Sequence, residues 1–132
     1  MRPLTTPRRR EALLLTAVLA LGATGCGPGA PEAPQAPYTS DDGTYHVPVL
    51  AQDMRFFPAQ IAVPDGRSLV IELTNVDGMP HDLVLPDGTT SGLISRGEDA
   101  VVDVGPVTEA FEAWCSVQGH RAAGMVLDVA PA

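Results

Sequence analysis

The sequence of 132 residues contains no lysine, and half of its eight arginines stand within the first ten residues. From residue 26 onward the chain carries four arginines and fifteen acidic residues, which gives a formal charge of −11. Binding to nucleic acid requires cations that neutralise phosphates, so this composition excludes a nucleic-acid partner. The charge could steer association with a basic partner, but an ordinary solvated acidic surface explains it equally well.

Long apolar runs are also missing. The run from Ala12 to Ala23 has twelve residues, whereas a membrane-spanning helix needs about 20. It follows a positive leader that contains Arg2 and the three arginines at 8–10. Residues 1–25 are therefore expected to be an export signal. The three arginines leave both the general secretory route and the twin-arginine route open.

Cysteine occurs only twice, at Cys26 and Cys115. In an exported protein, two cysteines ordinarily predict one disulfide. The segment ATGC that ends at Cys26 resembles the bacterial lipobox, although Ala23 stands where that motif usually has leucine. The resemblance implies a lipid on Cys26, which would anchor the protein at the outer face of the cell membrane or in the periplasm; plain secretion is the alternative. Lipidation would leave Cys115 without a partner, and a lone thiol in an oxidising compartment is a liability unless a metal occupies it.

Proline recurs at every third residue from Pro28 to Pro37. This spacing favours extended polyproline-like chain, so residues 26–40 are expected to form a semi-rigid tether of up to roughly 40 Å. Residues 41–132 should then form a single folded domain.

Short strand-like segments fill this domain, and no convincing long helix interrupts them. They lie at residues 45–51, 60–63, 68–74, 83–85, 100–104, 110–114 and 126–129. Pro-Asp-Gly triplets at 64–66 and 86–88 indicate turns, because proline fixes φ and glycine permits a positive φ. The pattern predicts an all-β domain, an antiparallel-rich sandwich or barrel.

The most informative residues for function are Cys115, His120 and Met125 in the run CSVQGHRAAGM, together with His81 in GMPHDLVL. Two imidazoles, a thiolate and a thioether are the ligands of a mononuclear electron-transfer copper site. We expect Cys115 to end one strand and Met125 to begin the next, with His81 at the start of a separate strand. Each residue alone has an ordinary structural interpretation, but their joint spacing favours copper.

The segment from Met54 to Met125 resembles the cupredoxins, the small blue copper proteins, in MRFFPAQIAV, VIELTNVDGMPHDLVL and WCSVQGHRAAGM. The Cys-x4-His-x4-Met spacing is most similar to the auracyanin and rusticyanin type. The resemblance implies a Greek-key β-sandwich or barrel. It also implies that His81, Cys115 and His120 are equatorial ligands of one copper ion and that Met125 is the axial ligand.

Two neighbours of His81 are expected to lie just outside the ligands. Many cupredoxins have asparagine or serine after the first histidine, whereas this chain has Asp82, whose ionised carboxylate would stabilise oxidised copper. Pro80 precedes His81, and small residues such as Gly119 and Ala122 flank the second histidine. The family pattern implies an apolar patch there, through which a redox partner reaches His120; the alternative is that small residues only permit a tight loop.

Three functions compete on this evidence. The favoured one is a membrane-tethered, extracytoplasmic carrier of single electrons between redox proteins, without a small-molecule substrate. An enzyme, such as a copper oxidase or nitrite reductase, is disfavoured because its clusters need more than the three histidines present, and a metal with four protein ligands lacks an open position. A role as an accessory domain of such an enzyme system remains an alternative. The third possibility is a copper carrier or buffer, although proteins of that kind tend to use exposed sites.

Overall fold

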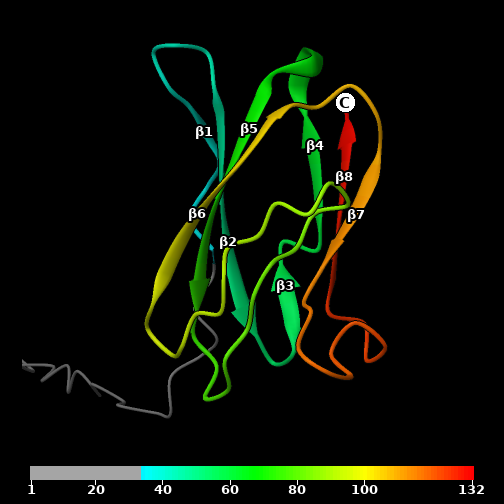
Figure 1. Ribbon diagram of the computed structural model, residues 1–132. Coiled ribbons are helices and arrows are strands. Elements are labelled where there is room, and N and C mark those ends of the chain that lie inside the picture. Colours follow the sequence, from blue (N-terminus) through cyan, green and yellow to red (C-terminus); the bar gives the residue numbers. More distant parts are fainter. Residues whose placement is uncertain (1–33) are drawn as a thin grey trace, which may run out of the picture. The chain divides into compact units, whose positions relative to one another are not determined.

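The computed structural model describes residues 34–132, which form two β-sheets (Figure 1). The first sheet contains β1 (Tyr38–Thr39), β2 (Tyr45–Gln52), β3 (Arg55–Phe57), β5 (Ser68–Asn75) and β6 (Asp99–Pro106). The second contains β4 (Gln60–Val63), β7 (Phe111–Trp114) and β8 (Val126–Pro131), and the short 3-10 helix η1 (Pro64–Gly66) follows β4. The expected export signal and the expected site of lipidation, Cys26, lie outside the described residues.

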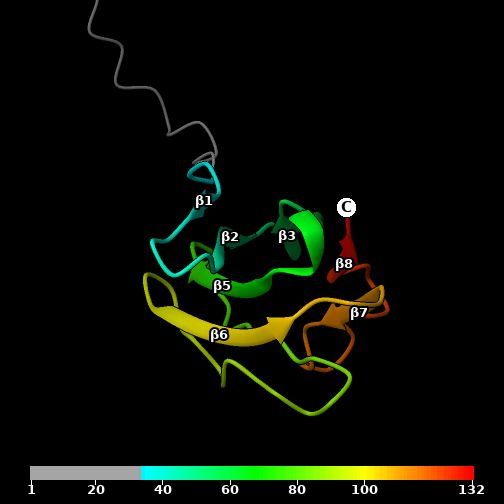
Figure 2. The ribbon, with the colours of Figure 1, turned by 90° about the horizontal axis from the view of Figure 1, so that it is seen from above.

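The two sheets combine parallel and antiparallel pairs. The order is β1-β2-β5-β6 in the first sheet, with β3 also on β2, and β4-β8-β7 in the second (Figure 2). β2 pairs with β5 in parallel and so does β4 with β8, whereas the other pairs are antiparallel. The all-β sandwich is confirmed. The sequence did not indicate the parallel pairs, which arise because the chain visits β4 of the other sheet between β2 and β5.

The core lies between the inward faces of the two sheets. β5 shows the expected alternation, with Leu69, Ile71 and Leu73 buried and the residues between them half-buried. Because side chains of a strand alternate between the two faces, this strand contributes one apolar row to the core. Cys115 and Met125 belong to the same buried cluster. Two of the four expected ligands are therefore part of the hydrophobic core.

Two segments differ from the sequence-based expectation. Tyr38 and Thr39, placed in the tether, pair with β2, and the Tyr38 hydroxyl donates to Glu72 Oε1 at 2.6 Å. The sheet therefore begins before residue 41. The segment 83–85 forms only isolated bridges, at Val84 with Thr90 and Trp114. A turn follows at once, in which the backbone N–H of Leu85 donates to Thr89 O at 2.8 Å, so no continuous ladder develops.

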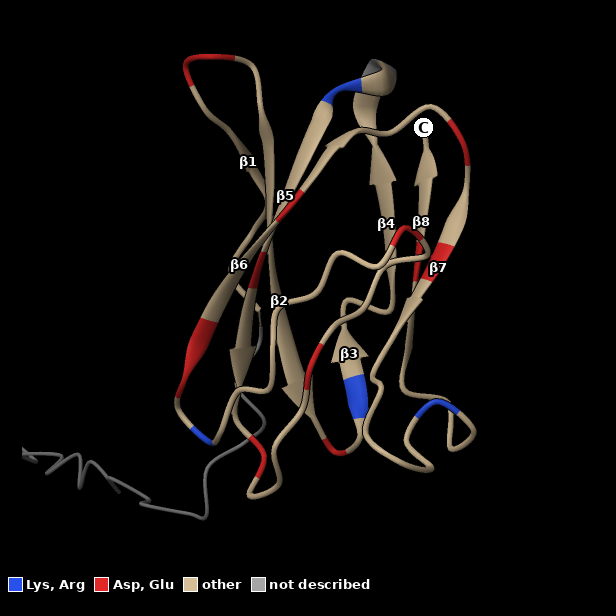
Figure 3. Cartoon of the chain, viewed as in Figure 1, with Lys and Arg blue, Asp and Glu red and all other residues tan. Residues whose placement is uncertain are grey.

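In residues 34–132, acidic residues outnumber arginines, and the acidic residues are widely distributed. Acidic residues lie along the strands and in loops at both ends of the sandwich, and arginines are few (Figure 3). No helix within residues 34–132 is long and apolar enough to cross a membrane. The acidic residues of this part of the chain are thus spread over several strands and loops.

Three connections meet at one end of the sandwich, opposite the C-terminus. They are the β2–β3 turn, the chain that leaves β5, and the β7–β8 loop (Figure 1). Residues 76–81 belong to the second connection and residues 115–125 to the third. The expected ligands from distant parts of the sequence therefore come together at this end.

Candidate metal centre

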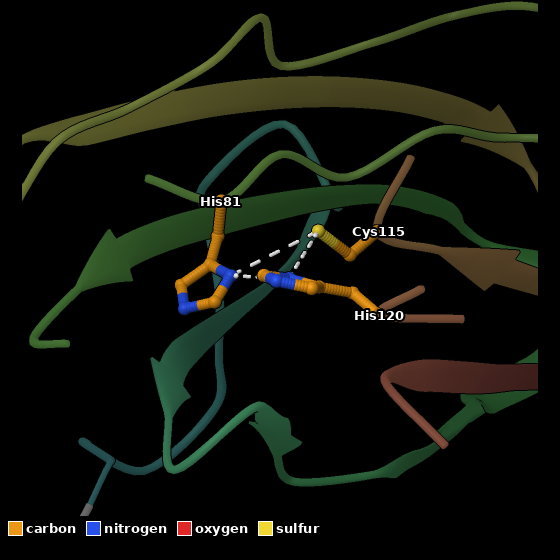
Figure 4. Close-up of side chains that lie close together, drawn as sticks. All are labelled: His81, Cys115 and His120. Atoms are coloured by element: carbon orange, nitrogen blue, oxygen red, sulfur yellow. Dashed lines mark hydrogen bonds between the residues drawn. The ribbon is translucent and has the colours of Figure 1, made fainter. Parts of the chain in front are cut away.

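Three of the expected ligands converge on one point (Figure 4). The Nδ1 atoms of His81 and His120 are 3.2 Å apart, and Cys115 Sγ lies 3.9 Å from His81 Nδ1 and 3.6 Å from His120 Nδ1. His81 and Cys115 are fully buried, and His120 is 4% exposed. Donor atoms from two separate loops are therefore held within an enclosed space.

The spacing of these atoms suits a metal ion. Metal bonds to imidazole and thiolate are about 2.0–2.3 Å long, so three donors around one ion stand roughly 3.5 Å apart. Two nitrogens and one sulfur are the equatorial set of an electron-transfer copper site. Burial raises the pKa of the Cys115 thiol, and a bound cation offsets that effect because it replaces the proton on sulfur. The donor set thus fits copper.

The β7–β8 loop folds back through its own backbone. Cys115 N–H donates to Met125 O at 3.1 Å, and Met125 N–H donates to His120 O at 3.0 Å. Gly119 and Gly124 adopt φ values of 85° and 94°, which glycine reaches without the steric cost of a Cβ. These bonds bring Met125, whose side chain is completely buried, next to the other two ligand residues of the loop.

His81 reaches the site without belonging to a strand. Its backbone exchanges two hydrogen bonds with Ile94, at 3.1 and 2.8 Å. Three residues further on, Val84 exchanges two with Trp114, at 2.8 and 3.0 Å. The second pair attaches the His81 segment to the end of β7, immediately before Cys115. The sequence predicted His81 as a ligand at the start of a strand, but it did not indicate these isolated bridges.

Asp82 joins the two ligand-bearing segments directly. Its carboxylate accepts the backbone N–H of Ser116 at 2.6 Å and also the Ser116 hydroxyl, and the residue is 5% exposed. Asp82 was expected to lie next to the site. In the structure it also connects the His81 segment to Ser116, which is 34 residues further along the chain. Pro80, its counterpart on the other side of His81, is exposed.

Asp77 contacts the opposite side of the His81 ring. Its Oδ2 lies 2.8 Å from His81 Nε2, and the carboxylate also accepts the backbone N–H groups of Asp53 at 2.8 Å and Met54 at 3.1 Å. Burial acts to raise the pKa of Asp77, but the hydrogen bonds from Met54, Asp53 and His81 outweigh it and lower the pKa overall. The carboxylate is therefore ionised at neutral pH and acts only as an acceptor.

Sequence reasoning missed the residues that support His81. Asn75 is completely buried; its Nδ2 donates to Met79 O at 2.8 Å and Ile94 O at 2.9 Å, and its Oδ1 accepts Asp77 N–H at 2.9 Å. A signal was present, because Asn75 continues the inward row of β5 and is the polar exception there. Asp77 carried no comparable signal, since two of its hydrogen-bond partners, Asp53 and Met54, come from a turn more than twenty residues upstream.

Comparison with known proteins gives relatives by structure only. No family model and no curated protein sequence matches the chain. An auracyanin B structure superposes with a TM-score of 0.60 at 16% identity, covering 76% of this chain and 96% of that one.

Two further solved structures, an auracyanin A and a plastocyanin, are also similar to this chain. Auracyanin A from Chloroflexus aurantiacus, described as a "blue" copper protein, gives a TM-score of 0.58 at 14% identity over 68% of this chain and all of that one. A mutant fern plastocyanin gives 0.51 at 19% identity, covering 65% of this chain and all of that one. The described domain therefore has the cupredoxin fold, with the candidate ligands gathered at one end of the sandwich.

Proposed function

We propose that this protein is a mononuclear blue copper protein that transfers single electrons between redox partners. The observation that carries the proposal is the buried triangle of His81 Nδ1, Cys115 Sγ and His120 Nδ1. When bound, copper would accept one electron from one partner, being reduced from Cu(II) to Cu(I), and would donate it to another, and no bond of a substrate is made or broken. We propose that His81, Cys115, His120 and Met125 would hold the copper ion.

The protein's own contribution is rigidity. Each ligand segment is fixed by backbone hydrogen bonds, and Asp82 ties one segment to the other. A site held in this way resists the change of geometry that each oxidation state alone would prefer, which favours rapid electron exchange. Four protein ligands also leave no open position for a substrate, so we propose a carrier and not an enzyme.

We further propose that electrons enter and leave near His120. The segments on either side of the ligands are exposed at Met79 and Pro80 in one loop and at Gly119, Ala122 and Ala123 in the other. Met79 is 48% exposed, which is high for a large apolar side chain. A redox protein that docks here would come close to the His120 ring without needing a charged contact.

The experiment that tests the carrier role is voltammetry of the copper-loaded full chain. We expect a reversible one-electron wave with fast exchange and with copper retained through repeated cycles; zinc-loaded protein, the control, gives no wave. Sluggish, irreversible waves with release of copper would contradict the carrier and favour a copper-handling protein instead.

Export and anchoring form a separate part of the proposal. We propose that residues 1–25 are removed and that a lipid on Cys26 holds the domain at the outer face of the cell membrane through the Pro-rich segment that follows. Mass spectrometry of the membrane fraction should find a lipidated peptide that starts at Cys26, and Cys26→Ser should release the protein. A soluble mature chain that starts at another residue would contradict the anchor.

A further inference from the structure

We propose that Asp77 is a positioning residue for the copper site: it holds the His81 ring in the tautomer that binds metal, and its negative charge favours the oxidised state. This inference rests on the proposed copper function. Its basis is one hydrogen bond, between Asp77 Oδ2 and His81 Nε2 at 2.8 Å, which lies on the far side of the ring from the metal-facing Nδ1.

The tautomer follows from the chemistry of the two partners. Asp77 Oδ1 accepts the backbone N–H of Asp53 and Oδ2 accepts that of Met54, so both oxygens act as acceptors and the hydrogen of the bond to His81 has to be on Nε2. In a neutral imidazole the other nitrogen then carries the lone pair. That nitrogen is Nδ1, the atom that faces Cys115 Sγ and His120 Nδ1. Asp77 thus leaves the correct nitrogen of His81 free to bind the metal.

The carboxylate is itself held in place by several contacts. Asn75 Oδ1 accepts the Asp77 N–H at 2.9 Å, and Asp77 accepts the N–H groups of Asp53 and Met54. Asp53 and Met54 adopt φ values of 52° and 53°, an uncommon conformation for residues with a side chain. Their N–H groups both point at Asp77, so the carboxylate connects the β2–β3 turn to His81.

The effect on copper has a definite sign. A partner that accepts from the outer nitrogen makes the ligating nitrogen a better donor, and a nearby negative charge favours Cu(II) over Cu(I). Asp77→Asn keeps the size of the side chain and removes the charge. Outer partners of this kind typically contribute 10–100-fold to metal affinity. We expect Asp77→Asn to weaken Cu(II) binding by about tenfold or more relative to Cu(I). Tenfold corresponds to a rise of about 59 mV in a one-electron potential.

Two control variants separate this role from support of the turn. Asp53→Gly removes one negative charge from the β2–β3 turn, which Asp77 contacts, but leaves the contact of Asp77 with His81 intact. The potential of this variant should therefore stay close to that of the wild type. Asp77→Asn combined with Asp53→Gly gives the turn a residue that accepts positive φ freely. The double variant should recover stability against urea and still keep the raised potential of Asp77→Asn.

The tautomer is measured without copper, so the inference can be tested even if the copper function is wrong. Nitrogen-15 NMR of the histidine rings in the metal-free full chain, in mildly alkaline buffer, should show the His81 proton on Nε2. In Asp77→Asn this preference should weaken. A proton on Nδ1 with a bare Nε2 in the wild type would overturn the inference, as would full recovery of the potential in the double variant. Failure of the wild type to form a coloured copper complex would instead contradict the proposed function.

Discussion

The two segments that bring candidate ligands to the site are built in different ways. The downstream segment, residues 115–125, connects neighbouring antiparallel strands and is closed by its own backbone, through Cys115, His120 and Met125. The upstream segment around His81 has no strand and depends on side chains and bridges from elsewhere, including Asn75, Asp77 and Ile94. The first segment is therefore supported by itself, whereas contacts that support the second reach as far along the chain as Asp53 and Trp114.

The difference has a consequence for stability and function. A loop that is closed by nearby backbone bonds tolerates changes at a distance, because its own contacts remain. A segment supported by scattered side chains is sensitive to each of them, since removal of one leaves buried polar groups unpaired. We therefore expect mutations that weaken the upstream segment to have larger effects than those in the downstream loop.

The largest expected effect comes from Leu83, which anchors the upstream segment in the core and is completely buried. Leu83→Ala should lower the free energy of unfolding by about 2–5 kcal/mol, as large-to-small changes in a core do. The matched control is Leu93→Ala in the same connection, where the side chain is 66% exposed and a change within about 0.5 kcal/mol is expected. Urea unfolding followed by circular dichroism measures both. Equal losses in the two variants would show that Leu83 is no anchor.

The link between the two segments comes next. Asp82→Ala removes the charged acceptor of two hydrogen bonds from Ser116, one of them from its backbone N–H, at an expected cost of about 1–3 kcal/mol. Ser116→Ala removes only the hydroxyl bond, so about 0.5–1.5 kcal/mol is expected.

A double-mutant cycle for this pair, measured by urea unfolding, should show coupling, because both changes act on one contact. Asp87→Ala serves as the control, since that exposed carboxylate also accepts a backbone N–H, from Thr89 at 2.9 Å. Strict additivity of the Asp82 and Ser116 effects would mean that the carboxylate does not connect the segments.

The downstream loop should respond more weakly. The Arg121 guanidinium lies 4.0 Å from the centre of the Trp114 ring, and its Nη2 is 2.8 Å from Glu112 Oε1. Both partners of this ion pair are about half exposed, so screening by solvent limits its contribution. Arg121→Ala should destabilise the protein by about 0.5–1 kcal/mol, most of it from the contact with the ring. Arg96→Ala serves as the control, because it removes the same charge at another position. If Arg121→Ala lowered the free energy of unfolding by more than Asp82→Ala does, the proposed order of the two segments would be reversed.

The smallest effect is expected at the opposite end of the sandwich, where Asp42 accepts from Ser40 Oγ at 2.6 Å and Thr44 N–H at 2.9 Å. These hydrogen bonds, of which the one from Ser40 has the largest effect, lower the pKa of Asp42 to about 2. The pKa of an aspartate in an unfolded chain is about 3.9. The stabilisation from the charged carboxylate is therefore present above about pH 4 and is lost as the pH falls toward 2.

Unfolding of the wild type and of Asp42→Asn across this range of pH measures the effect. The difference in stability between the two proteins should shrink as the pH falls from about 4 through 2, the pKa of Asp42 in the folded protein. A difference that stays constant over the whole range would refute the assignment, because it could not come from ionisation of Asp42.

The sequence predicted the downstream part of the site far better than the upstream part. The spacing of Cys115, His120 and Met125 between two strand-like segments indicated a loop with three ligands, since the geometry there is local. β4 and the apolar row of β5 followed from alternation in the same way. Identification of His81 as a ligand depended on the chemistry of the set and on a resemblance, and not on any local pattern.

What the sequence could not indicate depends on contacts between distant residues. The parallel pairing of β2 with β5 requires knowledge of where the chain travels between them. Asp77 looks like an ordinary loop carboxylate until the fold brings the turn at Asp53 and the ring of His81 to it. Pairing of Tyr38 with β2 was hidden by the regular prolines that precede it. Local periodicity contains no information on any of these three contacts.

The central claim, a copper site with Cys115 as its thiolate ligand, is tested most directly by the visible absorption spectrum of the Cu(II)-loaded protein. We expect intense colour from charge transfer between the Cys115 sulfur and copper in the wild type and in Cys26→Ser, and loss of the colour in Cys115→Ser. A folded wild-type protein that binds Cu(II) without colour would contradict the claim, and so would colour that survives in Cys115→Ser.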